Sequence, residues 1–96
     1  MSSTVPALRP AAVTVVRSAS CHLCEDALTA LAELATAYPL SVETVEAMDP
    51  RGVALVREHR VPIYPLVLVD GVFFSFGRLP RKKLVRLLAG RAGQVA

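Results

Sequence analysis

The feature that most constrains the fold of this chain is a pair of cysteines in the segment Cys21-His22-Leu23-Cys24. They are the only 2 cysteines, and they stand between a β-branched run, residues 13–16, and apolar residues at helical spacing. A helix that begins here presents free backbone N–H groups and its positive dipole end to a sulfur, which favours the thiolate. Because the thiolate is the nucleophilic form, the pattern indicates redox chemistry at a strand-to-helix junction.

Length and composition indicate one cytoplasmic domain. The chain has 96 residues, and 53% of them are apolar, which is enough for a single core. Charged residues recur too often for the roughly 18 consecutive apolar residues of a membrane span, and residues 1–10 lack the basic start and apolar stretch of a signal peptide. In the cytoplasm a lone Cys-x-x-Cys pair is catalytic or metal-binding rather than structural. The abundance of alanine and arginine favours a bacterial source.

Basic residues collect at the C-terminal end. The net charge is +3, and the last of the 8 acidic residues is Asp70. The basic residues beyond it are Arg78, Arg81, Lys82, Lys83, Arg86 and Arg91. A solvated helix face explains them most simply; the alternatives are a surface for an acidic partner, for the carboxylates of a thiol cofactor, or for nucleic acid. We expect neither a nucleic-acid partner nor a membrane partner.

The first half of the chain predicts a strand, a helix and a second strand. Residues 1–11 have no periodicity and read as a flexible arm, and residues 13–17 form a strand. The helix after the cysteines continues to Tyr38, where Pro39 ends it, and residues 40–46 form the second strand. The apolar residues that recur at helical spacing in this helix, and are expected to face the core, are Leu28, Leu31, Ala32, Ala35 and Tyr38.

The second half predicts a helix, a hairpin and a final helix. Asp49-Pro50 starts a helix that ends near Arg60, and Asp70-Gly71 joins strands 66–69 and 72–76. Period-two alternation puts Phe74 and Phe76 on one face, as packing residues. A turn at Gly77 leads to a helix from Pro80 that buries Leu84, Leu87 and Leu88 and ends near Gly90.

The order β-α-β-α-β-β-α predicts an α/β domain with a mixed four-stranded sheet. A β-α-β unit makes its two strands parallel, whereas the hairpin adds an antiparallel edge. The apolar run 66–69 alternates too little for a half-exposed sheet, so helices should cover both faces. We expect the domain to span residues 12–92, followed by a tail, 93–96.

Two motifs resemble those of the thioredoxin fold in its minimal, glutaredoxin-like form. They are Cys21-His22-Leu23-Cys24, similar to small bacterial glutaredoxin-like proteins of the Cys-His-Leu-Cys type, and Tyr64-Pro65 followed by a strand that ends in Asp-Gly. The resemblance spans about residues 12–90. It implies a cis-proline just before that strand, and Pro65 stands at the family's distance; Val61-Pro62 is the alternative.

The resemblance implies a dithiol–disulfide oxidoreductase that reduces protein or small-molecule disulfides. Cys21, exposed at the helix start, would attack the disulfide, and Cys24, one turn on, would resolve the mixed disulfide. A protonated His22 would favour the thiolate, whereas Glu25 and Asp26 would oppose it. The other residues expected to contact substrate are His22, Leu23, Tyr64 and Pro65.

The stretch after the hairpin bears on the electron donor. Glutaredoxins usually carry a Gly-Gly and an acidic residue there to hold glutathione, but this chain has Ser-Phe-Gly-Arg-Leu-Pro at 75–80. That stretch looks more like small redoxins that serve ribonucleotide reductase and are recharged by thioredoxin reductase. We expect a monomer without a tightly bound cofactor, reduced by thioredoxin reductase, another NADPH-dependent reductase or a low-molecular-weight thiol.

Two other functions remain open on the same fold. One is an iron–sulfur cluster carrier, which needs thiols from outside this chain because a cluster takes about four. The other is a redox-inert interaction module. A structural zinc site is not expected, because its four ligands would have to include His22, poorly placed between the thiols, and the distant His59.

Overall fold

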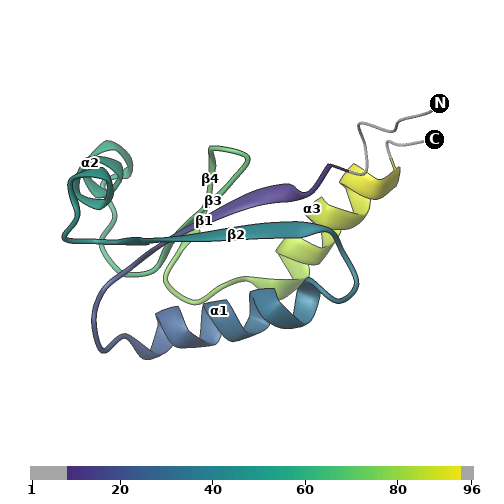
Figure 1. Ribbon diagram of the computed structural model, residues 1–96, viewed down its shortest axis with the longest axis horizontal. Coiled ribbons are helices and arrows are strands. Elements are labelled where there is room, and N and C mark those ends of the chain that lie inside the picture. Colours follow the sequence, from purple (N-terminus) through teal and green to yellow (C-terminus); the bar gives the residue numbers. More distant parts are fainter. Residues whose placement is uncertain (1–8, 94–96) are drawn as a thin grey trace.

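The computed structural model describes residues 9–93, and its elements follow the predicted order (Figure 1). They are β1 (Ala11–Arg17), α1 (His22–Leu34), β2 (Leu40–Glu46), α2 (Pro50–His59), β3 (Leu66–Val69), β4 (Val72–Phe76) and α3 (Arg81–Gly93). The strand β1 begins one residue before the expected domain boundary, and α3 ends one residue after it. Most of the expected arm and tail, residues 1–8 and 94–96, lies outside the described residues.

The four strands form one mixed sheet in the order β2-β1-β3-β4. The central strand β1 pairs in parallel with β2 and antiparallel with β3, and β3 pairs antiparallel with β4. Val16, near the end of β1, lies opposite Val45 of β2 and Leu66 of β3. The end of β1, the end of β2 and the start of β3 therefore meet at one edge of the sheet.

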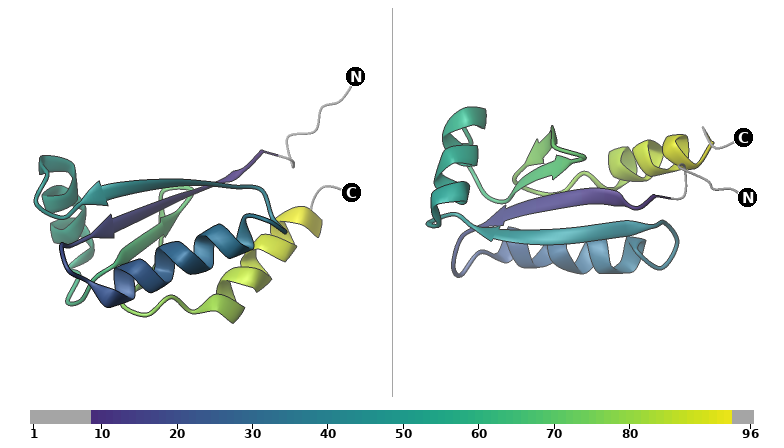
Figure 2. Two further views of the ribbon diagram at one scale, coloured as in Figure 1. Left: turned by 60° about the horizontal axis from the view of Figure 1, so that its bottom comes forward. Right: turned by 45° about the horizontal axis from the view of Figure 1, so that its top comes forward.

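Helices cover both faces of the sheet, as predicted (Figure 2). On one face, Val13 and Val15 of β1 pack with buried residues of α1 and α3, such as Leu31 and Leu84. On the other, Val16 and residues of β2 and β3 form a smaller cluster, against which the α2 residues Leu55 and Val56 are packed. Burial on both sides explains the near-continuous apolar runs of β1 and β3.

The helix α1 is shorter than predicted, and its buried face is turned. It ends at Leu34 rather than Tyr38. Beyond it, backbone hydrogen bonds reach back three residues instead of four, from the Thr36 N–H to the Glu33 carbonyl (3.2 Å) and from the Ala37 N–H to the Leu34 carbonyl (3.0 Å). A residue before proline disfavours the helical conformation, so Pro39 acts over more than one position. Burial of Cys24 sets the helix phase. Ala27, Ala30 and Leu31 are buried with it, and Leu28 and Tyr38 pack against the same cluster. The prediction is therefore confirmed for Leu28, Leu31 and Tyr38 and wrong for Ala32 and Ala35, which are exposed.

The helix α3 continues past Gly90, where the sequence predicted its end. The extension brings Arg91 within 3.0 Å of the Asp70 carboxylate, which also accepts a hydrogen bond from the Ala12 N–H. This ion pair ties the last turn to the hairpin and to the start of β1. Leu84 and Leu88 are buried as expected. They lie one helical turn apart and form the stripe of α3 that contacts the core, whereas Leu87 lies beside that stripe and is 40% exposed.

The hairpin has the predicted turn but an unpredicted bulge. Asp70 and Gly71 have φ of 52° and 79°, which fits a two-residue turn with two left-handed positions. The strand register shifts at Val67/Leu68, so one extra residue on β4 breaks the alternation. Phe74 is buried, whereas Phe73 and Phe76 contact each other on the opposite face with ring centroids 5.8 Å apart. The prediction that Phe74 and Phe76 share a face was wrong.

A close backbone approach joins α2 to the end of β2. Gly52 is buried, and a Cβ there would overlap the carbonyl oxygen of Glu46. The expected start of α2 is confirmed, with Asp49 at the cap position and Pro50 first in the helix, although the Asp49 side chain makes no capping hydrogen bond. Earlier in β2, a hydrogen bond from the Arg51 side chain lowers the pKa of the Glu43 carboxyl group.

We expect Gly52→Ala to destabilise the domain by about 1–3 kcal/mol, because the methyl group has no room against a backbone atom. The matched control is Gly90→Ala, where a Cβ meets nothing within 4 Å. That substitution should stabilise the helix by up to about 1 kcal/mol. Urea unfolding of both variants measures the difference; equal stabilities would contradict the close approach.

Candidate active site

The dithiol lies where β1 gives way to α1. Ser20, with φ of 54°, turns the chain, and Cys21 caps α1 with an extended backbone. The Cys21 sulfur accepts a hydrogen bond of 3.1 Å from the Cys24 backbone N–H. Such a bond, at the positive end of the helix, is the local feature that stabilises a thiolate.

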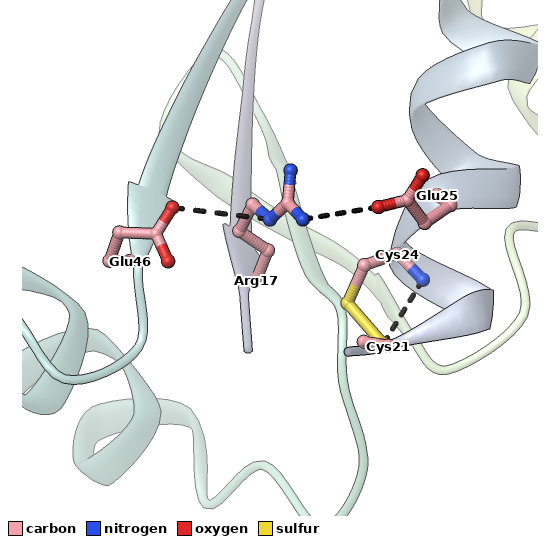
Figure 3. The surroundings of a disulfide bond; sticks show 5 residues. All are labelled: Arg17, Cys21, Cys24, Glu25 and Glu46. Atoms are coloured by element: carbon pink, nitrogen blue, oxygen red, sulfur yellow. Dashed lines mark hydrogen bonds and ion pairs between the residues drawn. A yellow bond between two sulfur atoms is a disulfide. The ribbon is translucent and has the colours of Figure 1, made fainter. Parts of the chain in front are cut away.

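The two cysteines form a disulfide with their Cα atoms 5.2 Å apart (Figure 3). Their exposures differ: Cys21 is partly exposed, less than the sequence predicted, and Cys24 is 0% exposed. Of the two residues, only Cys21 is in contact with solvent. The geometry matches the expected order of attack, although the individual roles stay predictions.

Arg17 forms an ion-pair cluster beside the dithiol that the sequence analysis did not find. Its guanidinium lies 3.3 Å from the Glu25 carboxylate of α1 and 3.9 Å from the Glu46 carboxylate at the end of β2 (Figure 3). Glu25 was expected to oppose the Cys21 thiolate, but Arg17 balances its charge. No sequence pattern indicates this cluster, because the three residues come from three elements that only the sheet register brings together.

The expected cis-proline is confirmed. The Tyr64–Pro65 peptide bond is cis, and Val61–Pro62 is not among the cis bonds of the described residues. Pro65 is buried, and its carbonyl accepts a hydrogen bond from Gly77 N–H at 3.0 Å. Because Leu66 pairs with Val16, Pro65 lies at the same sheet edge as the end of β1 and the loop to Cys21.

The remaining predicted contact residues differ in their surroundings. His22, the first residue of α1, is exposed, and Leu23 is half-buried and lines a groove between α1 and the start of α3. Tyr64 is half-buried and packs against the α2-side core. Their contact with substrate stays a prediction.

The comparison with protein families agrees with this geometry. The thioredoxin domain family matches residues 11–89. The chain belongs to this family. It is a small redoxin of the thioredoxin fold, and its Cys-x-x-Cys disulfide marks it as a redox domain. The comparison with curated proteins gives no match.

Two further observations concern the described residues only. Within residues 9–93, no helix combines the length and apolar character needed to cross a bilayer. The same residues contain no group of three or more histidine, cysteine or acidic side chains placed to hold a metal ion.

The charge balance at Arg17 yields a prediction for the Cys21 thiol. In a Cys24→Ser background, we expect the pKa of Cys21 to lie below the typical value of about 8.5. Arg17→Gln should raise that pKa by roughly half a pH unit, because the Glu25 carboxylate is then unbalanced near the sulfur. Thiolate absorbance against pH measures it.

A second substitution separates charge from structure. Adding Glu25→Gln to Arg17→Gln should bring the pKa back down, since it removes the unbalanced carboxylate. Arg51→Gln, which breaks the exposed pair with Glu43, is the control and should leave the Cys21 pKa unchanged. If Arg17→Gln behaves like that control, the cluster has no influence on the thiol.

Proposed function

We propose that this redoxin is a dithiol–disulfide oxidoreductase that reduces disulfides of proteins or small molecules. The observation that carries the proposal is the asymmetry of the pair. Cys21, a partly exposed residue, caps the helix and its sulfur accepts a backbone hydrogen bond, whereas Cys24, one turn later, is fully buried. Exposure and thiolate stabilisation suit Cys21 to attack, and burial keeps Cys24 from reacting with outside molecules.

The reaction proceeds in two exchanges. The Cys21 thiolate attacks one sulfur of the substrate disulfide, so that bond breaks, a mixed disulfide forms and the first substrate sulfur leaves as a thiolate that takes a proton. Cys24 then loses its proton and attacks the Cys21 sulfur. The Cys21–Cys24 disulfide forms, and the second substrate thiol leaves. Two electrons have passed from the dithiol to the substrate, and the two product thiols have taken the proton released by Cys24 and one proton from solvent.

The disulfide form must then be reduced from outside. An NADPH-dependent disulfide reductase or a low-molecular-weight thiol supplies two electrons by the same exchange, run in the opposite direction. The stretch 75–80 favours thioredoxin reductase over glutathione, because it lacks the Gly-Gly-acid element. Its Gly77, with φ of 76°, bonds to the Pro65 carbonyl, and Ser75 is buried.

Substrate contacts are proposed at the edge that holds Cys21 and Pro65. In this arrangement His22 and Leu23 border the sulfur on the helix side, and the Tyr64–Pro65 backbone borders it on the β3 side. An extended substrate segment pairing with that backbone would place its disulfide near Cys21. Because all peptides share the same backbone groups, pairing of this kind accommodates substrate segments of many sequences.

Single-cysteine variants test the mechanism. Cys21→Ser should abolish reduction of 2-hydroxyethyl disulfide, a small neutral substrate, because the attacking sulfur is gone. Cys24→Ser should accumulate a mixed disulfide on Cys21, detected by intact mass. Trapping on Cys24 in Cys21→Ser instead would reverse the assigned roles. Protein isolated brown, with a bound cluster and no disulfide reductase activity, would favour the cluster-carrier alternative.

The donor proposal is tested by comparing two reducing systems. With NADPH supplied in both, thioredoxin reductase should sustain turnover at least severalfold faster than glutathione with its own reductase. Consumption of NADPH at 340 nm is the measurement, with Cys21→Ser as the background control. Faster turnover with glutathione would show that the altered stretch 75–80 still accepts that thiol.

A further inference from the structure

A groove of about 720 Å³ lies between α1 and the segment that leads into α3. Its apolar lining includes Leu23, Ala27 and Ala30 of α1 and Leu79 and Pro80 before α3. Its basic lining is Arg78, Arg81, Lys82, Lys83 and Arg86. A single acidic residue, Asp26, lines it as well, so the groove has an apolar floor and a strongly positive rim.

Four of the five basic side chains have no carboxylate partner among the described residues, and three of these have no other polar contact there. Arg81 lies 3.0 Å from Glu33, and the Lys83 ammonium lies 3.5 Å from the Phe74 carbonyl oxygen and 5.0 Å from the centroid of its ring. Arg78, Lys82 and Arg86 are exposed, and no ion pair within 4.0 Å joins them to a described carboxylate. Their fields add at the rim and attract negative charge.

The groove begins next to the reactive pair. Leu23, which stands between the two cysteines, Ala27 and Ala30 recur at the spacing of one helix face, and that face lines the groove. Glu25 points instead toward Arg17 (Figure 3), so its charge is balanced away from the groove. A chain bound along the groove therefore has one end beside Leu23 and Cys21.

We propose that this groove binds an acidic peptide segment that flanks the disulfide of a protein partner. The proposal rests on the proposed function, since it requires the partner's disulfide to reach Cys21. The positive rim matches acidic side chains, and the apolar floor accommodates the small apolar side chains between them. Attraction of this kind raises the association rate more than it raises the affinity.

Nucleic acid is the less suitable occupant. Proteins that bind single strands combine positive charge with aromatic side chains on which bases stack. Among residues 9–93, no aromatic side chain lines this groove. The exposed rings of Phe73 and Phe76 lie on the sheet face covered by α2, where Phe73 stacks on His59 at 5.9 Å.

The test compares two peptide disulfides of equal length, one with glutamates and one with lysines beside the cysteines. For the unaltered protein we expect kcat/KM to be roughly tenfold higher for the glutamate peptide at low salt. The preference should shrink as ionic strength rises from about 0.01 M to 1 M, where screening shortens from about 30 Å to 3 Å. This salt series needs no variant.

Two charge-reversal variants locate the effect. Lys82→Glu/Arg86→Glu should abolish or invert the preference. Arg57→Glu/Arg60→Glu, at the end of α2, changes net charge by the same amount at exposed residues outside the groove and should keep it. Retention of the preference in Lys82→Glu/Arg86→Glu, or loss in both variants alike, would overturn the proposal.

The remaining outcomes separate the groove from the chemistry. If 2-hydroxyethyl disulfide is reduced but both peptides react equally at low salt, the groove proposal fails and the proposed function stands. If that neutral disulfide is not reduced at all, the proposed function fails, and the groove proposal with it. Stronger competition by a single-stranded oligonucleotide than by a disulfide-free glutamate peptide would assign the groove to nucleic acid and contradict the proposal.

Discussion

The site depends on the burial of β1 at the centre of the sheet. Val13 and Val15 pack under α1 and α3, and Val16 packs on the α2 side, so neither face of the strand is left to water. Hydrogen bonding to β2 on one side and β3 on the other then fixes its register. The chain leaves β1 at a defined point, and Cys21 is held at the start of α1 on the same sheet edge as Pro65.

The charged residues near the dithiol lie on two different sides of α1. On one side Arg17 pairs with the carboxylates of Glu25 and Glu46 and offsets one of their two negative charges, and on the other Asp26 lines a groove rich in basic residues. Neighbouring helix residues project about 100° apart, so consecutive acids reach different surroundings. Arg17 thus offsets part of the negative charge near Cys21, and the helix N-terminus adds a positive field. Together these contacts favour the thiolate that exchange requires.

Local signals predicted most of the fold. The element order and the Asp70-Gly71 turn rest on local patterns, and the choice of Pro65 rests on the resemblance to glutaredoxin-like redoxins; the structure confirms all three. The phase of α1 depends on burial of Cys24, and the faces of β4 depend on a bulge at Val67/Leu68 that has no sequence signature. The two cysteines could be found in the sequence. The Arg17 cluster and the groove could not, because they join elements distant in the chain.

The closed and open sides of the dithiol restrict how a partner approaches. Cys24 is fully buried, Arg17 and its two carboxylates occupy the side toward β2, and Pro65, just before β3, lies at the same sheet edge as the end of β1. The side that stays open to a partner is the one along α1, where Leu23 begins the groove. A partner that pairs its backbone beside Pro65 gains little sequence preference there, since backbone hydrogen bonds are common to all peptides. Under the proposed function, selection among partners therefore falls to the side chains that flank the disulfide and to the charge they bring to the rim of Arg78, Lys82 and Arg86.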